Sequence, residues 1–294
     1  MGRLFGTDGV RGVANRDLTP ELAFQLGRVG AHILMRKKGL AVGSGRIVIG
    51  GDTRVSGEML EAALVAGITS AGVQAELLGV TPTPGVAHLT RKLEADAGVM
   101  ISASHNPVAD NGIKFFDHQG YKLTDEVEDE IESFLTVERS REIGRPVGVE
   151  VGRVFRREGV GQEYIKFLTA TTSQSFAGMT VVLDCAFGAT YATAPQVFTE
   201  LGANVIAIHA ENDGSRINVR CGSTYPLFFR KKWRVGEHRL VLPTTGTETG
   251  SLLSMKKGNW WMGTRLSGSA AYNCWLKAAY RSKPSPLPSI VTWA

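Results

Sequence analysis

A serine and a histidine stand side by side where an apolar run ends in a turn. Residues 98–107 read Gly-Val-Met-Ile-Ser-Ala-Ser-His-Asn-Pro, and the final Asn-Pro step favours a turn. We therefore expect Ser104 to be exposed at the end of a strand, where α/β enzymes place their reacting groups. A basic residue, Lys114, follows in the segment Asn-Gly-Ile-Lys-Phe-Phe at 111–116.

Two kinds of chemistry fit Ser104 and His105. A nucleophile with its base is one, but neighbours in sequence rarely face each other and the chain contains no Gly-x-Ser-x-Gly elbow. A hydroxyl that carries a phosphoryl group fits better, because that charged group needs a cation such as Lys114 nearby. Taken alone, the segment is also explained as an ordinary Asx-Pro turn.

Three further loops belong to the same pattern. Residues 5–12, Phe-Gly-Thr-Asp-Gly-Val-Arg-Gly, would let backbone approach an anion closely while Arg11 binds it with paired donors. Residues 50–54, Gly-Gly-Asp-Thr-Arg, and residues 81–84, Thr-Pro-Thr-Pro, each follow a short strand-like run. Each of the three, taken singly, is equally consistent with a connecting turn.

The elements that must position these loops alternate between strands and helices up to about Pro226. This alternation predicts a mostly parallel sheet flanked by helices. Helices are predicted over residues 20–36 and 125–135, with Thr19 and Thr124 as their N-caps. Strands are predicted at residues 46–49, 75–78, 98–101, 180–184 and 204–208.

The composition divides the chain into unlike parts. The last 68 residues contain all five tryptophans and 11 basic against 2 acidic residues, whereas the preceding 226 contain 22 basic and 26 acidic. The net charge of +5 therefore belongs to the tail. We predict a first domain over residues 1–140 and a linker over residues 141–160. A partial second domain follows over residues 161–226, and residues 227–294 form an aberrant, poorly ordered tail.

Composition also limits the cellular context. No apolar run reaches the roughly 18 residues that span a bilayer, and the N-terminus lacks the apolar stretch of a signal peptide. We therefore expect a cytoplasmic protein with no membrane partner. Cys185, Cys221 and Cys274 are far apart and have no metal-ligand spacing, which favours buried free thiols.

Taken together and in their order along the chain, five segments resemble the bacterial phosphoglucosamine mutases of the α-D-phosphohexomutase superfamily. They lie at residues 5–12, 51–54, 81–84, 101–107 and 111–116, and the likeness runs from residue 2 to about 226. The resemblance implies a phosphohexomutase-type mixed sheet flanked by helices, with the first domain complete and the second truncated. It also implies conversion of glucosamine 6-phosphate to glucosamine 1-phosphate through a phosphoserine and a bisphosphate intermediate.

The resemblance assigns roles to four residues. Ser104 is the implied phosphoserine, and because its phosphate binds Mg²⁺ in the family it is also the implied metal ligand. Arg11 and Lys114 match cleft residues near that phosphate, and His105 has an implied supporting role beside it. Such a set suits phosphoryl transfer, in which positioning and charge stabilisation account for most of the catalysis.

The chain departs from the family pattern after residue 226. It lacks the Asp-Gly-Asp-x-Asp-Arg loop that supplies the other metal ligands, and it lacks the later loops that bind the sugar and its phosphate. Before residue 226 there is one smaller departure, because Phe187 stands where the family usually has Asn. Codons read one nucleotide earlier let residues 243–250 encode Asp-Gly-Asp-Gly-Asp-Arg and residues 259–263 encode Leu-Val-Asp-Gly. This pattern indicates a frameshift near residues 223–232, in which case we expect the chain to lack mutase activity.

Three functional interpretations therefore stay open. They are a phosphoglucosamine mutase, a phosphomannomutase or phosphoglucomutase of the same superfamily, and a non-catalytic fragment whose basic tail binds nucleic acid. The third depends on tail charge alone, without a nucleic-acid-binding motif or a basic helix. We therefore expect a sugar phosphate as partner and no nucleic acid. The sequence predicts neither the oligomeric state nor what first phosphorylates Ser104.

Overall fold

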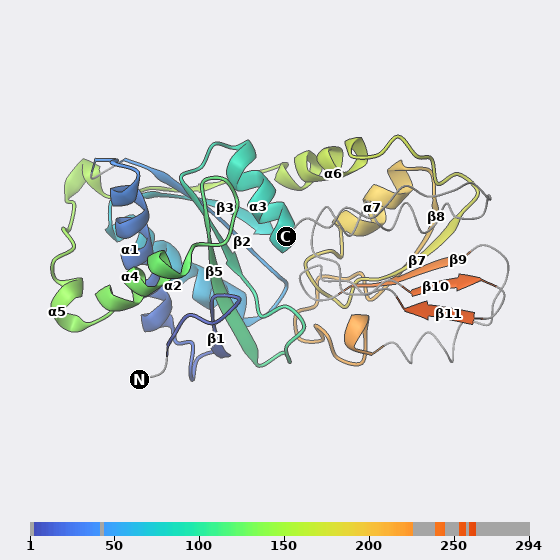
Figure 1. The fold of residues 1–294 in the computed structure, drawn as a ribbon, viewed down its shortest axis with the longest axis horizontal. Helices are drawn as coiled ribbons and strands as arrows, with labels where there is room; N and C mark the ends of the chain where they lie inside the picture. The colour runs from blue at the N-terminus through green and yellow to red at the C-terminus, as the bar shows by residue number, and fades with distance from the viewer. Residues whose placement is uncertain (1–2, 42–43, 226–238, 245–252, 257–258, 263–294) are drawn as a thin grey trace.

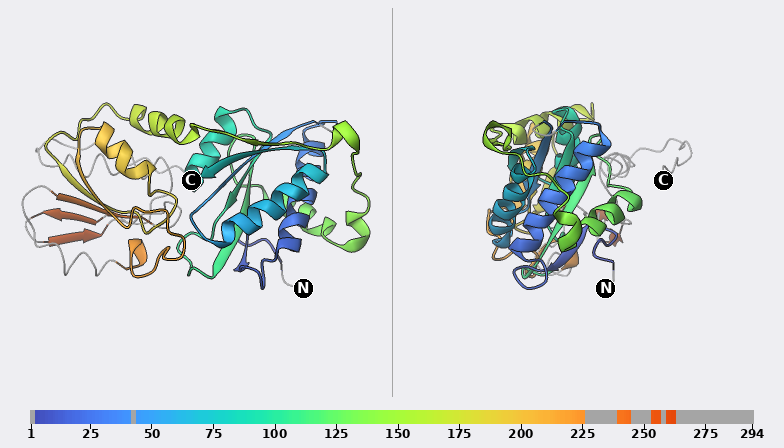
Figure 2. Two further views of the ribbon diagram at one scale, coloured as in Figure 1. Left: turned by 180° about the vertical axis from the view of Figure 1, so that it is seen from behind. Right: turned by 90° about the vertical axis from the view of Figure 1, so that its left-hand side faces the viewer.

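The computed structural model describes residues 3–41, 44–225, 239–244, 253–256 and 259–262. These residues form two α/β units that lie side by side along the long axis of the molecule, as Figures 1 and 2 show. Each unit has its own sheet, and helices cover the first sheet on both faces. The expected mixed sheet flanked by helices is confirmed. Within the described residues, no helix combines the length and apolarity needed to cross a membrane.

The first unit is built on a six-stranded sheet in the order β1-β5-β4-β2-β3-β6. Neighbouring pairs among β2, β3, β4 and β6 are parallel, whereas β5 is antiparallel to both β4 and β1. The predicted strands at 46–49, 75–78 and 98–101 are confirmed, each at least one residue longer. The strands are β1 (Val10–Val13), β2 (Arg46–Gly51), β3 (Gln74–Val80), β4 (Ala97–Ile101), β5 (Asp110–Asp117) and β6 (Val154–Arg156).

Alternate residues of β2 face opposite layers of helices. Ile47 and Ile49 belong to the core under α1, α2 and α4, whereas Val48 belongs to the core under α3, together with the first residue of α6. This period of two is expected for a strand buried on both faces. The helices are α1 (Pro20–Lys37), α2 (Ser56–Ser70), α3 (Thr83–Lys92), α4 (Asp125–Phe134), the short α5 (Val137–Ser140) and α6 (Val160–Ala170), with a 3₁₀ turn η1 at Gly148–Glu150.

Both predicted helix starts are confirmed, but their caps differ. The Thr19 hydroxyl accepts a hydrogen bond from the Leu22 amide at 3.3 Å, which satisfies one unpaired N–H of the first turn. Thr124 is the N-cap of α4, yet its side chain makes no cap hydrogen bond. The two longest helices, α1 and α2, approach closely: a Cβ on Gly27 would lie 2.3 Å from the Leu64 carbonyl oxygen.

The second unit is built on a five-stranded sheet in the order β11-β10-β9-β7-β8. The predicted strands β7 (Thr180–Asp184) and β8 (Asn204–Ile208) are confirmed, with α7 (Thr193–Glu200) packed against them. The sequence predicted no element after Pro226, but the structure places β9 (Arg239–Pro243) parallel to β7 and adds β10 (Leu253–Lys256) and β11 (Asn259–Met262). A 3₁₀ turn, η2, lies at Gly222–Thr224.

The segment that connects the two units contacts both of them. Within the predicted linker 141–160, β6 pairs with β3 of the first sheet. In α6, Phe167 stacks on His88 of α3 with ring centroids 3.7 Å apart. The same helix contacts the second unit, where the Gln162 amide nitrogen donates to the Gln196 side-chain oxygen at 2.9 Å. The connection is therefore folded structure rather than an extended tether.

Candidate active site at the Ser104 loop

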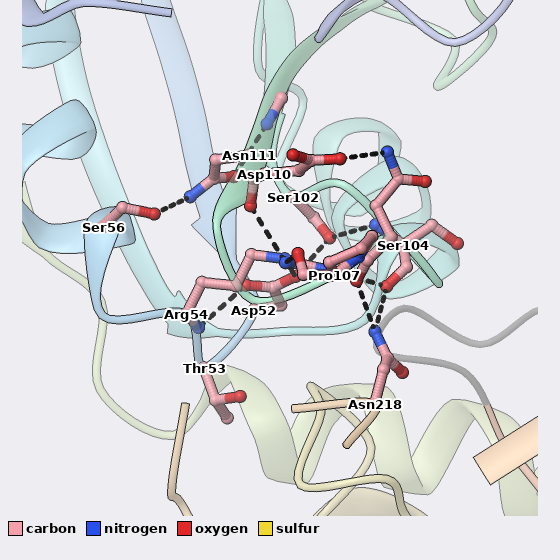
Figure 3. Close-up of polar contacts among 12 residues, drawn as sticks. Asp52, Thr53, Arg54, Ser56, Ser102, Ser104, Pro107, Asp110, Asn111 and Asn218 are labelled. Carbon is pink, nitrogen blue, oxygen red and sulfur yellow. Dashed lines mark hydrogen bonds and ion pairs between the residues drawn. The ribbon is translucent and has the colours of Figure 1, made fainter. Parts of the chain in front are cut away.

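Ser104 lies three residues beyond the end of β4, in the loop that leads to β5 (Figure 3). The expectation of an exposed serine is wrong, because Ser104 is only 8% exposed. Its φ angle is +55°, in the left-handed region that costs a non-glycine residue on the order of 1–3 kcal/mol. Such a conformation persists only when the surrounding groups fix it.

Arg54 is the side chain that fixes this loop, although the sequence of its segment is equally consistent with a connecting turn. Its guanidinium donates hydrogen bonds to four backbone carbonyls, as Figure 3 shows: Nη1 to Pro107 at 2.5 Å and Asp110 at 2.9 Å, and Nη2 to Ser104 at 3.0 Å and Asn106 at 2.9 Å. The Arg54 side chain is completely buried. The loop is therefore wrapped around a single arginine.

Asp52 in turn holds Arg54. Its carboxylate lies 3.0 Å from Nε of Arg54 and accepts the Arg54 backbone N–H at 2.9 Å. The Ser102 hydroxyl donates to the same carboxylate and accepts the Ser104 backbone N–H at 3.0 Å. Burial raises the pKa of the Asp52 carboxyl and lowers the pKa of the Arg54 guanidinium, and the mutual attraction of the two charges opposes both shifts.

Asn218, a residue of the second unit, also binds the Ser104 loop. The amide nitrogen of Asn218 donates to the Ser104 carbonyl at 2.8 Å and to the Asn106 carbonyl at 3.2 Å. Two carbonyls that Arg54 binds thus receive a second donor from the other unit. Nothing in the sequence pattern around Asn218 indicated this contact, since it joins residues more than a hundred positions apart.

Phe187, the departure from the family pattern, contacts the first unit through its backbone. The Thr53 hydroxyl donates a hydrogen bond to the Phe187 carbonyl, so this contact does not depend on the side chain. The Phe187 ring lies against Arg216, whose guanidinium carbon is 4.2 Å from the ring centroid. Packing between the units is close here, because a Cβ on Gly214 would lie 1.7 Å from the Thr53 carbonyl oxygen.

Arg11 and Lys114, the two predicted cations, meet at Asp8. Nη2 of Arg11 lies 3.5 Å and Nζ of Lys114 lies 3.3 Å from the two Asp8 oxygens. The antiparallel pairing of β1 with β5 brings the two cations together, and both side chains stay partly exposed. A Cβ on Gly9 would lie 2.4 Å from the Ile113 carbonyl oxygen, so this glycine permits approach to a strand rather than to an anion.

Arg11 also borders the Ser104 loop. A Cβ on Gly112 would lie 2.6 Å from the Ser102 carbonyl oxygen and 2.9 Å from Cγ of Arg11. Because Gly112 has no side chain, both groups pack closely against it. His105 is exposed directly after Ser104. The structure thus assembles a rigidly held serine and a pair of cations at one end of the first sheet, a combination that can carry and stabilise a transferable phosphoryl group.

The described residues do not by themselves fit a magnesium site at Ser104. Mg²⁺ prefers carboxylate and other oxygen ligands in octahedral geometry. Among the Asp, Glu, His and Cys side chains of the described residues, the group that could hold a metal ion is Asp184, His209 and Cys221, with only one carboxylate. Residues 243–250, where the shifted frame encodes an Asp-rich loop, lie outside the described part of the chain from residue 245 onward.

Cys185 and Cys221 are buried free thiols, as the sequence predicted, and Cys274 lies outside the described residues. Burial, and to a smaller extent the charge of Asp184, raises the pKa of each of the two buried thiols to about 12. Only the thiolate is nucleophilic, so both should stay protonated and unreactive toward iodoacetamide at pH 8 and react fully in urea. Mass spectrometry of a Cys274→Ser chain counts the labels, and rapid labelling of the folded chain would contradict the burial.

Comparison with known proteins shows which family this chain resembles. Residues 2–142 match the family model described as phosphoglucomutase/phosphomannomutase, alpha/beta/alpha domain I. The phosphoglucosamine mutase of Desulforamulus reducens is 58% identical over 226 residues, which cover 77% of this chain and 50% of that protein. The phosphoglucosamine mutase of Carboxydothermus hydrogenoformans is 52% identical over 260 residues, covering 88% and 57%. The chain thus spans about half the length of the curated relatives it matches.

Solved structures show the same fold. A phosphoglucomutase/phosphomannomutase family protein from Burkholderia thailandensis has a TM-score of 0.74 at 20% identity, covering 88% of this chain and 56% of that one. A protein from Thermus thermophilus described as a putative phosphomannomutase has a TM-score of 0.70 at 23% identity, covering 85% and 56%.

Proposed function

Residues 2–142 of this chain are domain I of the phosphoglucomutase/phosphomannomutase family, and from that premise we propose that Ser104 is the phosphoryl carrier of a sugar-phosphate mutase. The observation that carries the proposal is the bracing of Ser104 by Arg54 from one unit and Asn218 from the other. This bracing holds one hydroxyl-bearing residue in a strained conformation beside Arg11 and Lys114. A serine that only capped a turn would not need it.

In the proposed reaction, phospho-Ser104 donates its phosphoryl group to a hydroxyl of a hexose phosphate. The bond between phosphorus and Oγ of Ser104 breaks, a bond to the sugar oxygen forms, and the sugar proton ends on the serine hydroxyl. The bisphosphate then returns its other phosphoryl group to Ser104 by the reverse exchange. Arg11 and Lys114 offset the charge of the group in transit.

The sugar is proposed to be glucosamine phosphate, since both relatives described above are named phosphoglucosamine mutases. The family resemblance implies that Mg²⁺ would bind the Ser104 phosphate. No step of the proposed reaction is assigned to this ion. The alternative, a phosphomannomutase or phosphoglucomutase, has the same serine chemistry and differs in the sugar it accepts. A non-catalytic fragment is the third possibility, and it predicts no turnover.

Under the frameshift hypothesis, the position of β9 determines where the restored Asp-rich loop would lie. β9 runs parallel to β7, so its carboxyl end lies at the same edge of the second sheet as Asp184. The segment that encodes an Asp-rich loop in the shifted frame begins at Pro243, the last residue of β9. Carboxyl ends of parallel strands are where α/β proteins place ligand-binding loops.

Resequencing of the codons for residues 223–232, followed by assay of the frame-restored protein, tests the proposed function. We expect an inserted or lost nucleotide, and a kcat/KM for glucosamine 6-phosphate at least about tenfold above those for glucose and mannose 6-phosphates, because a site built around a substrate amine or hydroxyl discriminates against analogues. Preference for another hexose phosphate would support the alternative mutase, and absence of any turnover would support the non-catalytic fragment.

A further inference from the structure

A pocket on the first unit, which we call the Arg28 pocket, lies outside the Ser104 loop. It is formed by side chains of α1 and α2 and by Ser140 and Arg145, which follow α4, and its volume is about 520 Å³. Figure 1 shows α1, α4 and α5 at the end of the first unit that points away from the second sheet. The pocket shares no residue with the site of proposed phosphoryl transfer, and its size is within the range of small-molecule sites.

Arg28 is an incompletely satisfied buried cation. It is only 6% exposed, and its Nη2 donates a hydrogen bond to the Ile143 carbonyl at 2.8 Å. Its Nε is buried without a hydrogen-bond partner, and it is the one such side-chain nitrogen or oxygen among the residues that the structure describes. A buried donor without a partner is energetically unfavourable, so an acceptor brought by a ligand would stabilise this nitrogen.

A second arginine also favours a bound acceptor. Arg145 lines the same pocket and is exposed at its edge. Burial, and then the positive charge of Arg145, lowers the pKa of Arg28. Glu21 also lines the pocket, but among the described ion pairs none joins a carboxylate to Arg28 or Arg145. Two guanidinium groups therefore share one pocket, and the Glu21 carboxylate that lines it forms no described ion pair with either of them.

We propose that the Arg28 pocket binds a small organic phosphate. Guanidinium groups bind phosphate oxygens through paired N–H donors, and a phosphate group has three acceptor oxygens for the donors of two arginines. A carboxylate has only two. Phe24, Val29 and Ala63 line the same pocket and provide apolar surface for the organic part of the ligand. Inorganic phosphate would satisfy the charge but leave this surface uncovered.

Isothermal titration of the 294-residue chain with glycerol 3-phosphate tests the proposal, with acetate at equal ionic strength as the comparison anion. Arg145→Gln should raise the Kd for glycerol 3-phosphate about tenfold, the effect of losing one charge-assisted hydrogen bond. Arg28→Lys keeps the positive charge but loses the paired N–H donors of the guanidinium group, so it should also weaken binding. Arg141→Gln, a neighbouring exposed arginine outside the pocket, is the matched control and should leave the Kd unchanged.

Arg11→Gln distinguishes this pocket from the Ser104 loop. Binding that is lost in Arg11→Gln but retained in Arg145→Gln would place the phosphate at the Ser104 loop and overturn the proposal. Equal weakening in Arg145→Gln and Arg141→Gln would show a non-specific charge effect and would also overturn it. Acetate binding as tight as that of glycerol 3-phosphate would contradict the preference for a phosphate group. If Arg145→Gln only dissociates a self-associated chain in sedimentation, the occupant is an acidic group of a second copy, and the proposal is wrong.

Discussion

Replacing Arg54 by methionine lowers the free energy of unfolding by about 3–5 kcal/mol, the cost of removing one partner from a buried ion pair. The Asp52 carboxylate loses its charge partner, and its side chain is fully buried. Four loop carbonyls lose a donor at the same time, two of them shared with Asn218. Urea denaturation monitored by circular dichroism measures the change.

Arg16→Gln is the matched control for this substitution. Arg16 also pairs with a carboxylate close in sequence, Asp17 at 2.9 Å, but both side chains are largely exposed. Exposed pairs contribute little, so the change should stay within about 0.5 kcal/mol. A loss below about 1 kcal/mol in Arg54→Met would show that the loop does not depend on Arg54 in the way its hydrogen bonds indicate.

On the proposed function, we expect Ser104→Gly to abolish mutase turnover while leaving the fold intact. The proposed carrier hydroxyl is lost, and removal of a group that forms the covalent intermediate lowers kcat by about 10⁴-fold or more. Glycine adopts the observed φ of +55° without steric cost, although it loses more conformational entropy on folding. The free energy of unfolding should therefore stay within about 1 kcal/mol of the original value. Kinetics of the frame-restored protein and urea denaturation measure the two quantities.

Ser56→Ala controls for the loss of a nearby hydroxyl. Ser56 accepts a hydrogen bond from the Asn111 amide at 2.9 Å and belongs to α2, so its removal should leave turnover within about threefold. Retained turnover in Ser104→Gly would reject Ser104 as the carrier. Lost turnover accompanied by unfolding would instead assign the effect to stability.

Strands that lie in the interior of the first sheet could be predicted from the sequence, whereas its antiparallel edge could not. β2 and β4 are continuous apolar runs, and this pattern is specific for strands buried on both faces. β5 begins with Asp110-Asn-Gly, which is typical of a turn, and only its pairing with β4 and β1 makes it a strand. The strands beyond Pro226 were missed because the tryptophan-rich, basic composition of the tail obscured short apolar runs such as Leu-Val-Leu at 240–242.

The candidate site shows the same division between local and long-range information. Ser104, Arg11 and Lys114 belong to sequence segments whose residue types indicate anion chemistry, so they could be named in advance. Asp52 and Arg54 lie in a motif that was noticed, but a motif does not show which carbonyls a guanidinium reaches. Asn218 could not be found, because its contact with Ser104 depends on how the two units pack.

The two supports of the Ser104 loop become available at different times during synthesis. Arg54 and every carbonyl it binds lie within the first 110 residues, so this support forms as soon as the first sheet folds. Asn218 leaves the ribosome more than a hundred residues later. Because domains fold from the N-terminus during translation, the Ser104 carbonyl first binds Arg54 of its own unit and binds Asn218 only when the second unit arrives. A nascent chain paused between these points would have the Ser104 loop held by Arg54 alone.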